Sequence, residues 1–180
     1  MSVLLTNSYQ AIASGTKSFT ANEISCGVKQ TIYARYELID SEAQSAILNV
    51  KTVVEGTKNS FTSSGNTQTI VLDGTKKTKS YTIGTISNGT KKETFETSFT
   101  VAYDEDGTWS NKDISASTDV YLNYVVQAAG QISLPAIATS NVYLGVDGEV
   151  KKTHAYVGVD GVATKCEVYV GVDGTPVKCA

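Results

Sequence analysis

The chain has 180 residues, a net charge of −3 and a pI of about 5.2, so it lacks the concentrated basic face that a duplex-binding protein needs. Its 41% of apolar residues allow a real core, and only 18% are charged, which argues against a disordered chain. No run approaches the roughly 18–20 apolar residues of a membrane span, and we expect neither a nucleic-acid nor a membrane partner.

The N-terminal residues 1–5 lack the positive start and long apolar run of a signal peptide. We therefore expect synthesis in the cytoplasm, or a fragment of a longer protein. The cysteines Cys26, Cys166 and Cys179 show no metal-ligand spacing, and their odd number fits reduced thiols.

Short alternating segments are typical of strands through the first half of the chain. The expected strands are 3–5, 17–20, 31–40, 46–54, 61–63, 69–73 and 80–86, with the rest of 6–27 irregular. The strongest helical candidate is one turn at 41–45. Such frequent turns and only two prolines predict an antiparallel sandwich.

Gly-Thr-Lys recurs at Gly15, Gly56, Gly74 and Gly89, and Asp or Asn precedes two of these glycines. Asx-Gly favours the turns that join hairpin strands. Lysine pairs follow glycine turns at 76–77, 91–92 and 151–152. We interpret these pairs as charges that protect strand edges and keep loop ends soluble.

The clearest pattern covers residues 93–126. Residues 95–103 alternate, a polar turn follows at 104–107, and a second alternation begins at Ile114 and continues to Val126. This pattern predicts one long antiparallel hairpin, with a bulge or bend near Asn111 because Trp109 is out of phase. A last strand is expected at 131–134, where Pro135 ends it.

After a predicted linker at 136–140, the sequence repeats every 13 residues. The three copies begin at Tyr143, Tyr156 and Tyr169, and each continues with x-Gly-Val-Asp-Gly. Each copy predicts a small hairpin turning at Asp-Gly. We therefore expect an antiparallel immunoglobulin-like β-sandwich at 1–135 and three β-hairpin repeats at 141–180.

Equivalent positions stack in repeat architectures, so Tyr143, Tyr156 and Tyr169 are expected to form one stripe. The stripe is either the core of the repeat itself or an exposed aromatic ladder that contacts sugars or a partner chain. The hairpins alone bury little surface, so they either stack into a small solenoid or associate with other chains.

Residues suited to catalysis are scarce. The single histidine, His154, occupies a repeat position held by Glu167 and Ala180 in the other copies. The carboxylates of Asp104, Glu105 and Asp106 could bind calcium, although a hairpin turn explains them equally well. We expect no enzyme activity, no cofactor and no metal.

Two features carry a resemblance. The run 100–108, which leads to Asp-Ile-Ser-Ala-Ser at 113–117, resembles a hairpin common in tail and minor structural proteins of long-tailed bacteriophages. Leu134-Pro135-Ala136-Ile137 matches the start of their Leu-Pro-x-Ile-Pro closing segment, with Ala138 in place of the second proline. The Tyr-Val-Gly-Val-Asp-Gly repeat is similar to repeats at the ends of phage structural proteins from gut Firmicutes.

The resemblance covers residues 93–180 and implies an immunoglobulin-like module in a virus particle. It implies a virion structural protein, in the tail or another surface component, that acts by contacts with other virion subunits and is expected to be a homo-oligomer. The alternative is a carbohydrate-binding module or adhesin that recognises a bacterial surface glycan.

Overall fold

The computed structural model describes residues 2–4, 8–40, 43–104, 107–122, 124–137, 142–146, 149–153, 156–159, 162–165, 169–172 and 175–178. The chain divides into two compact units, Met1–Ala136 and Ile137–Ala180. Every regular element in the described residues is a strand, and the strands pair antiparallel with their neighbours. The predicted all-β antiparallel class is therefore confirmed.

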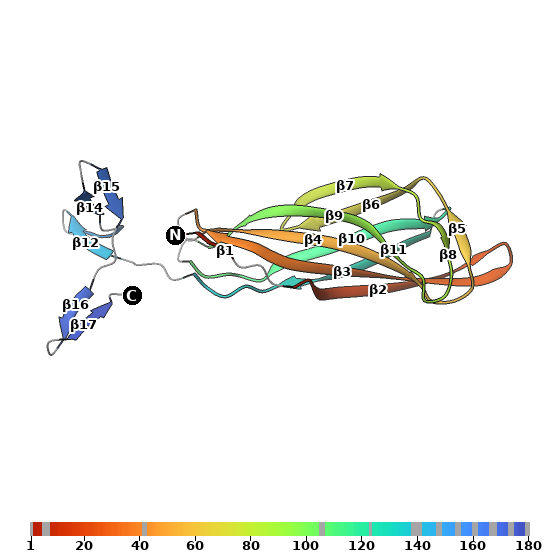
Figure 1. The fold of residues 1–180 in the computed structure, drawn as a ribbon, viewed down its shortest axis with the longest axis horizontal. Helices are drawn as coiled ribbons and strands as arrows, with labels where there is room; N and C mark the ends of the chain where they lie inside the picture. Colours follow the sequence, from red (N-terminus) through yellow and green to blue (C-terminus); the bar gives the residue numbers. More distant parts are fainter. Residues whose placement is uncertain are drawn as a thin grey trace. The chain divides into compact units, whose positions relative to one another are not determined.

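The first unit contains two main sheets, which lie as two layers in Figure 1. One sheet has the order β1-β3-β4-β9. β2 also pairs with β3, along residues 24–34, whereas β1 pairs with residues 38–40. Its strands are β1 (Ser2–Leu4), β2 (Gln10–Ala21), β3 (Ile24–Asp40), β4 (Ser45–Gly56) and β9 (Lys91–Ala102).

The second sheet has the order β11-β10-β6-β7. Its strands are β6 (Asn66–Leu72), β7 (Thr75–Tyr81), β10 (Lys112–Tyr121) and β11 (Tyr124–Ile132). A small pair, β5 (Phe61–Ser63) with β8 (Gly84–Ile86), lies at the same end of the unit as the β2–β3 turn (Figure 1).

The core lies between the two sheets, and the alternation of the strands explains it. In β10, Ile114, Ala116, Thr118 and Val120 are buried while the residues between them are partly exposed. Leu48, Val50 and Val54 of β4 are buried in the same way from the other sheet. Such strands bury one face against the opposing sheet, and the result is a sandwich.

The long hairpin predicted at residues 93–126 is wrong. β9 pairs with β4, whereas β10 pairs with β6 and β11, so the two alternating segments belong to different sheets. The true hairpin is β10–β11, with its turn after Tyr121. Alternation reports which face of a strand is buried, and both sheets bury a face against the same core, so the pattern alone could not assign the partner.

Some of the other predicted elements need correction. The segment 6–27 was expected to be irregular apart from a strand at 17–20, but Gln10–Ala21 forms β2 and Ile24 begins β3. Gly15 lies inside β2 opposite Gln30. A Cβ at Gly15 would lie 1.7 Å from the carbonyl oxygen of Gln127, so this glycine permits the close approach of β2 to β11. The predicted strand 80–86 contains the end of β7 and all of β8. Of the predicted last strand 131–134, only Gln131 and Ile132 are strand, and they end β11. The predicted helical turn at 41–45 lies partly outside the described residues, and Ser45 begins β4.

The immunoglobulin-like part of the prediction is not confirmed. In the immunoglobulin order the second strand lies between the first and the fifth, and the third strand belongs to the other sheet. Here β3 lies between β2 and β4, which follow one another along the chain. We therefore describe the first unit as an antiparallel β-sandwich.

The second unit contains three hairpins with equivalent registers. They are β12 (Val142–Val146) with β13 (Glu149–Thr153), β14 (Tyr156–Val159) with β15 (Val162–Lys165), and β16 (Tyr169–Val172) with β17 (Thr175–Lys178). Each copy of the 13-residue repeat thus supplies one hairpin, and the turn residues Asp-Gly lie outside the described residues.

Candidate functional site

The three predicted tyrosines occupy the same register position in their hairpins. Tyr143 pairs with Lys152, and the tyrosines of the other two copies likewise pair with the lysine nine residues further on: Tyr156 with Lys165 and Tyr169 with Lys178. The stripe that they were predicted to form concerns side chains outside the described residues, and it stays a prediction. His154, Cys166 and Cys179 also lie outside them.

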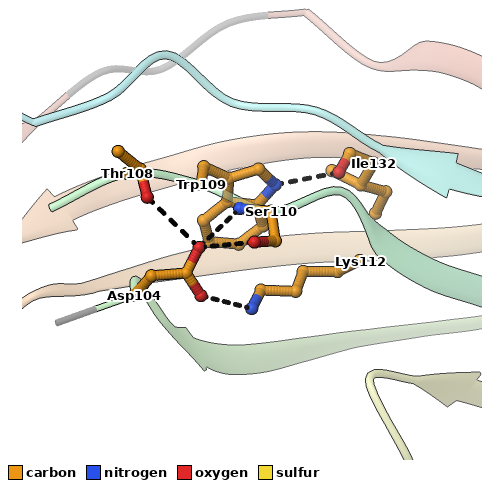
Figure 2. Close-up of polar contacts among 6 residues, drawn as sticks. All are labelled: Asp104, Thr108, Trp109, Ser110, Lys112 and Ile132. Atoms are coloured by element: carbon orange, nitrogen blue, oxygen red, sulfur yellow. Dashed lines mark hydrogen bonds and ion pairs between the residues drawn. The ribbon is translucent and has the colours of Figure 1, made fainter. Parts of the chain in front are cut away.

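Asp104 organises the connection between the two sheets (Figure 2). Its Oδ2 accepts hydrogen bonds from the Ser110 amide at 2.8 Å and the Ser110 hydroxyl at 2.6 Å, and its Oδ1 lies 3.5 Å from Lys112 Nζ. The bonds from Ser110 are the main cause that lowers the pKa of Asp104 below 3.8, and the nearby Lys112 ammonium adds to the effect. The carboxylate is therefore a structural acceptor that holds the turn.

This geometry bears on the calcium alternative. The oxygens of Asp104 already bind protein donors, one of them a cation, and Glu105 and Asp106 lie outside the described residues. In the part of the chain that the structure describes, no group of three or more His, Cys, Asp or Glu residues is placed to hold a metal ion. The turn interpretation accounts for the contacts of Asp104 through Ser110 and Lys112.

Trp109 fixes the same connection to the end of β11. Its indole Nε1 donates to the carbonyl oxygen of Ile132 at 2.9 Å, as Figure 2 shows. Its ring packs edge-to-face on Tyr103 at 4.9 Å, and the Tyr103 hydroxyl donates to the carbonyl oxygen of Pro135 at 3.1 Å. These contacts anchor residues 132–135, where the chain leaves the sandwich.

A buried polar network crosses the core between the two sheets. The Gln68 amide nitrogen donates to the carbonyl of Ser117, and its oxygen accepts from the Thr94 hydroxyl at 2.9 Å. Thr94 also pairs with Thr52 at 2.8 Å. The Gln30 amide is oriented with its nitrogen toward the carbonyls of Ala116 and Val126 and its oxygen toward Gln68, because that orientation satisfies both atoms.

The members of this network are amides and hydroxyls whose hydrogen-bonding groups are used by one another and by the backbone. Buried polar networks of this kind fix the register of the elements they join. The network therefore positions one sheet on the other.

Charged side chains meet on the outer face of β3, β4 and β9. The Tyr9 ring lies 4.8 Å from the Arg35 guanidinium and 4.5 Å from Lys51 Nζ, and the Tyr9 hydroxyl donates to Glu96. Burial of the Tyr9 hydroxyl and its bond to Glu96 raise the pKa of Tyr9 to about 12. Through these contacts Tyr9, which directly precedes β2, is fixed to side chains of β3, β4 and β9.

Among the side chains that the structure describes, the large apolar ones that are exposed lie at two hairpin turns. We call Ile24, Leu122, Tyr124 and Val125 the apolar tip, and they are 50%, 78%, 37% and 41% exposed. The two turns are adjacent, since the Tyr121 hydroxyl lies 3.4 Å from Asn22 Oδ1. Exposed apolar clusters of this kind mark contact surfaces more often than single exposed residues do.

Beside the apolar tip, aromatic side chains pack around Phe19. Buried Phe19 stacks on Tyr121 at 5.8 Å and on Tyr124 at 5.2 Å, and packs edge-to-face on Phe61 at 5.0 Å. Phe19 belongs to a hydrophobic cluster drawn from both sheets, in which Cys26 is a fully buried free thiol. Tyr124 of the apolar tip is thus held by packed aromatic rings.

The turn at Leu122 carries backbone strain. Leu122 has a φ of 49°, in the left-handed region that bulky side chains disfavour. Within the described part of the chain, the other non-glycine residues with positive φ are all polar: Asn22, Glu23, Gln44 and Asp73. Leu122 is both strained and exposed, which makes its side chain a candidate for a contact surface.

Sequence reasoning missed the apolar tip because it placed residues 121–125 inside a strand. The even-numbered alternation at Ile114–Val120 resumes at Val126, because the register shift between Asp119 and Tyr121 offsets the change of parity at the turn between Tyr121 and Tyr124. With no Gly or Pro at the turn, the pattern appears uninterrupted. The available signal was Leu122-Asn123, where asparagine tolerates the left-handed conformation.

Comparisons with protein-family models, with curated proteins and with solved structures returned no match. Within the described residues no helix is long and apolar enough to cross a membrane.

Proposed function

We propose that this chain is a structural protein of a virus particle, made in the cytoplasm of its bacterial host, that works by protein–protein contacts in assembly or display. The observation that carries the proposal is the apolar tip, an exposed group of residues at one end of the sandwich that includes the strained Leu122. Its partners are other virion subunits, and further copies of the chain are expected among them.

The layout of the first unit supports this role. β11 starts at the apolar tip and runs the length of the β10–β11 hairpin, so the chain leaves the sandwich at the opposite end, where Tyr103 and Trp109 anchor it. The resemblance of residues 93–180 to phage tail and minor structural proteins supports the particle as the setting.

Density-gradient fractions of particles from the source strain, probed with an antibody against residues 1–136, test the proposal. We expect the protein to band with intact particles and to remain there after a high-salt wash. A protein found only in the soluble fractions, and strictly monomeric by light scattering at all concentrations, would contradict it.

The second candidate is a carbohydrate-binding module or adhesin that recognises a bacterial surface glycan. The exposed Tyr124 ring favours it, because aromatic rings stack on sugars, and the predicted stripe of Tyr143, Tyr156 and Tyr169 would extend such a surface. Glycan-array binding that is lost in Tyr124→Ala, or in the double variant Tyr156→Ala/Tyr169→Ala, would favour this candidate. Absence of glycan binding, together with particle association, would favour the virion role.

A further inference from the structure

The four outer strands of the sandwich are not equally covered. β2 and β11 approach each other closely, since a Cβ at Gly15 would meet the Gln127 carbonyl, and a Cβ at Gly130 would lie 3.0 Å from the Ala13 Cβ. These two edges therefore shield one another. Edges matter because their unpaired N–H and C=O groups can bind another strand.

The edge of β9 is covered by lysines of β7. Lys77 Nζ donates to the carbonyl oxygen of Ser98 and lies 5.0 Å from the centre of the Phe99 ring. Lys79 Nζ lies 5.9 Å from the centre of the Phe95 ring. These contacts close the open side of the sandwich between the two sheets.

The outer edge of β7 has no strand partner among the described residues. Asp73 and Gly74 have φ values of 47° and 75°, which fits a two-residue type I′ turn, so the flanking pair Leu72 and Thr75 is hydrogen-bonded. Alternate residues then bond inward to β6. The N–H and C=O groups of Lys76, Thr78 and Ser80 consequently face away from the sheet, and all three residues are exposed.

Lysines on an edge strand usually discourage pairing, which is how the sequence was interpreted above. Here Lys77 and Lys79 reach inward to β9, so Lys76 is the lysine that flanks the outward-facing groups. The edge is less protected than its sequence suggests.

The charge of the β7 lysines decides which kind of strand can pair with the outer edge of β7. In a pairing of β7 with a second copy, two strands that each carry three lysines and no carboxylate would lie side by side, and like charges across a strand pair are destabilising. A strand with carboxylates at alternate positions would instead place negative charge beside these lysines. The charge pattern therefore favours an acidic partner over a second copy.

We propose that the outer edge of β7 is a docking site for an extended acidic segment of a partner protein, which adds to the β11-β10-β6-β7 sheet as a fifth strand. Backbone hydrogen bonds to Lys76, Thr78 and Ser80 hold the segment, and its carboxylates select the edge through the β7 lysines. The site does not depend on whether the chain belongs to a virus particle.

Amide hydrogen exchange, followed by NMR on the full chain, tests the site with two capped seven-residue peptides, one alternating Thr with Glu and the other alternating Thr with Lys. The Glu peptide is expected to slow exchange at Lys76, Thr78 and Ser80 by about tenfold at millimolar concentration, and the Lys peptide is not. Equal effects of the two peptides, or no protection of these amides by the Glu peptide, would overturn the proposal.

Two variants complete the test. Thr78→Pro removes one outward N–H without removing a bond to β6 and should abolish the protection, whereas Thr78→Val keeps that N–H and should retain it. Binding that survives in a folded Thr78→Pro protein would contradict strand addition. Concentration-dependent protection of the same amides without peptide would show that a second copy occupies the edge, and would equally overturn the acidic segment.

Discussion

Replacing Leu122 with asparagine separates folding from contact at the apolar tip. Asparagine tolerates the left-handed backbone, so Leu122→Asn should relieve roughly 1 kcal/mol of strain. Leu122 is 78% exposed, so about a fifth of the side chain is covered. Full burial of a leucine stabilises by about 1.5–3 kcal/mol, and the covered fifth is therefore worth about 0.3–0.6 kcal/mol.

Subtracting the lost burial from the relieved strain predicts that Leu122→Asn stabilises the sandwich by about 0.5 kcal/mol. For a chain of this size that corresponds to a rise in Tm of about 1–2 °C. Urea denaturation and calorimetry of the full-length protein measure it. Two controls sharpen the result. Leu122→Ala keeps the strain and loses the covered surface, so it should not stabilise, and Asp73→Asn exchanges residues that both tolerate positive φ and should change little.

The reasoning would be refuted if Leu122→Asn destabilised the protein by more than about 1 kcal/mol, since that would give Leu122 a packing role in the fold. The same variant should weaken particle association if the apolar tip is a contact surface. A stabilised protein that still joins particles normally would show that the exposed leucine is not used there.

Three further predictions follow from the interior and the connection. Gln68→Leu should destabilise the sandwich by roughly 3 kcal/mol in urea denaturation, because it leaves buried partners without hydrogen bonds, whereas the exposed Gln131→Leu should cost little. The pKa of Asp104 in the folded protein is lower than the ordinary value of 3.8, so the hydrogen bonds of its carboxylate stabilise the fold fully above pH 3.8. This stabilisation is lost as the pH falls through the pKa of the folded state. Fluorescence of the single tryptophan, Trp109, should report that release, and Asp104→Asn should remove the acid-dependent step. Deleting residues 141–180 should leave the sandwich folded, and its collapse by circular dichroism would contradict the predicted boundary.

The sequence predicted the strands that bury one face and failed where pairing depends on distant residues. Alternation in β4 and β10 follows from burial against the opposing sheet, so it can be detected locally. The choice of β4 as the partner of β9 depends on packing between residues about fifty positions apart, such as Asn49 and Ser98. No local pattern contains that information.

The candidate sites also divide into those that a local sequence pattern reveals and those that depend on residues far apart in the sequence. Tyr143, Tyr156 and Tyr169 were selected because they recur, and the hairpins place them in equivalent registers. The apolar tip and the β7 edge come from the way separate strands meet in space. Lys77 illustrates the difference, because its inward contact with Ser98 could not be inferred from its place in a lysine pair.

Photo-crosslinking from position 122 in assembled particles tests the central claim most directly. A photoreactive phenylalanine analogue at position 122 should crosslink to another virion subunit on illumination, and the same analogue at the exposed position 131 should not. Crosslinking at both positions alike, or at neither in particles that contain the protein, would contradict a role for the apolar tip in particle contacts.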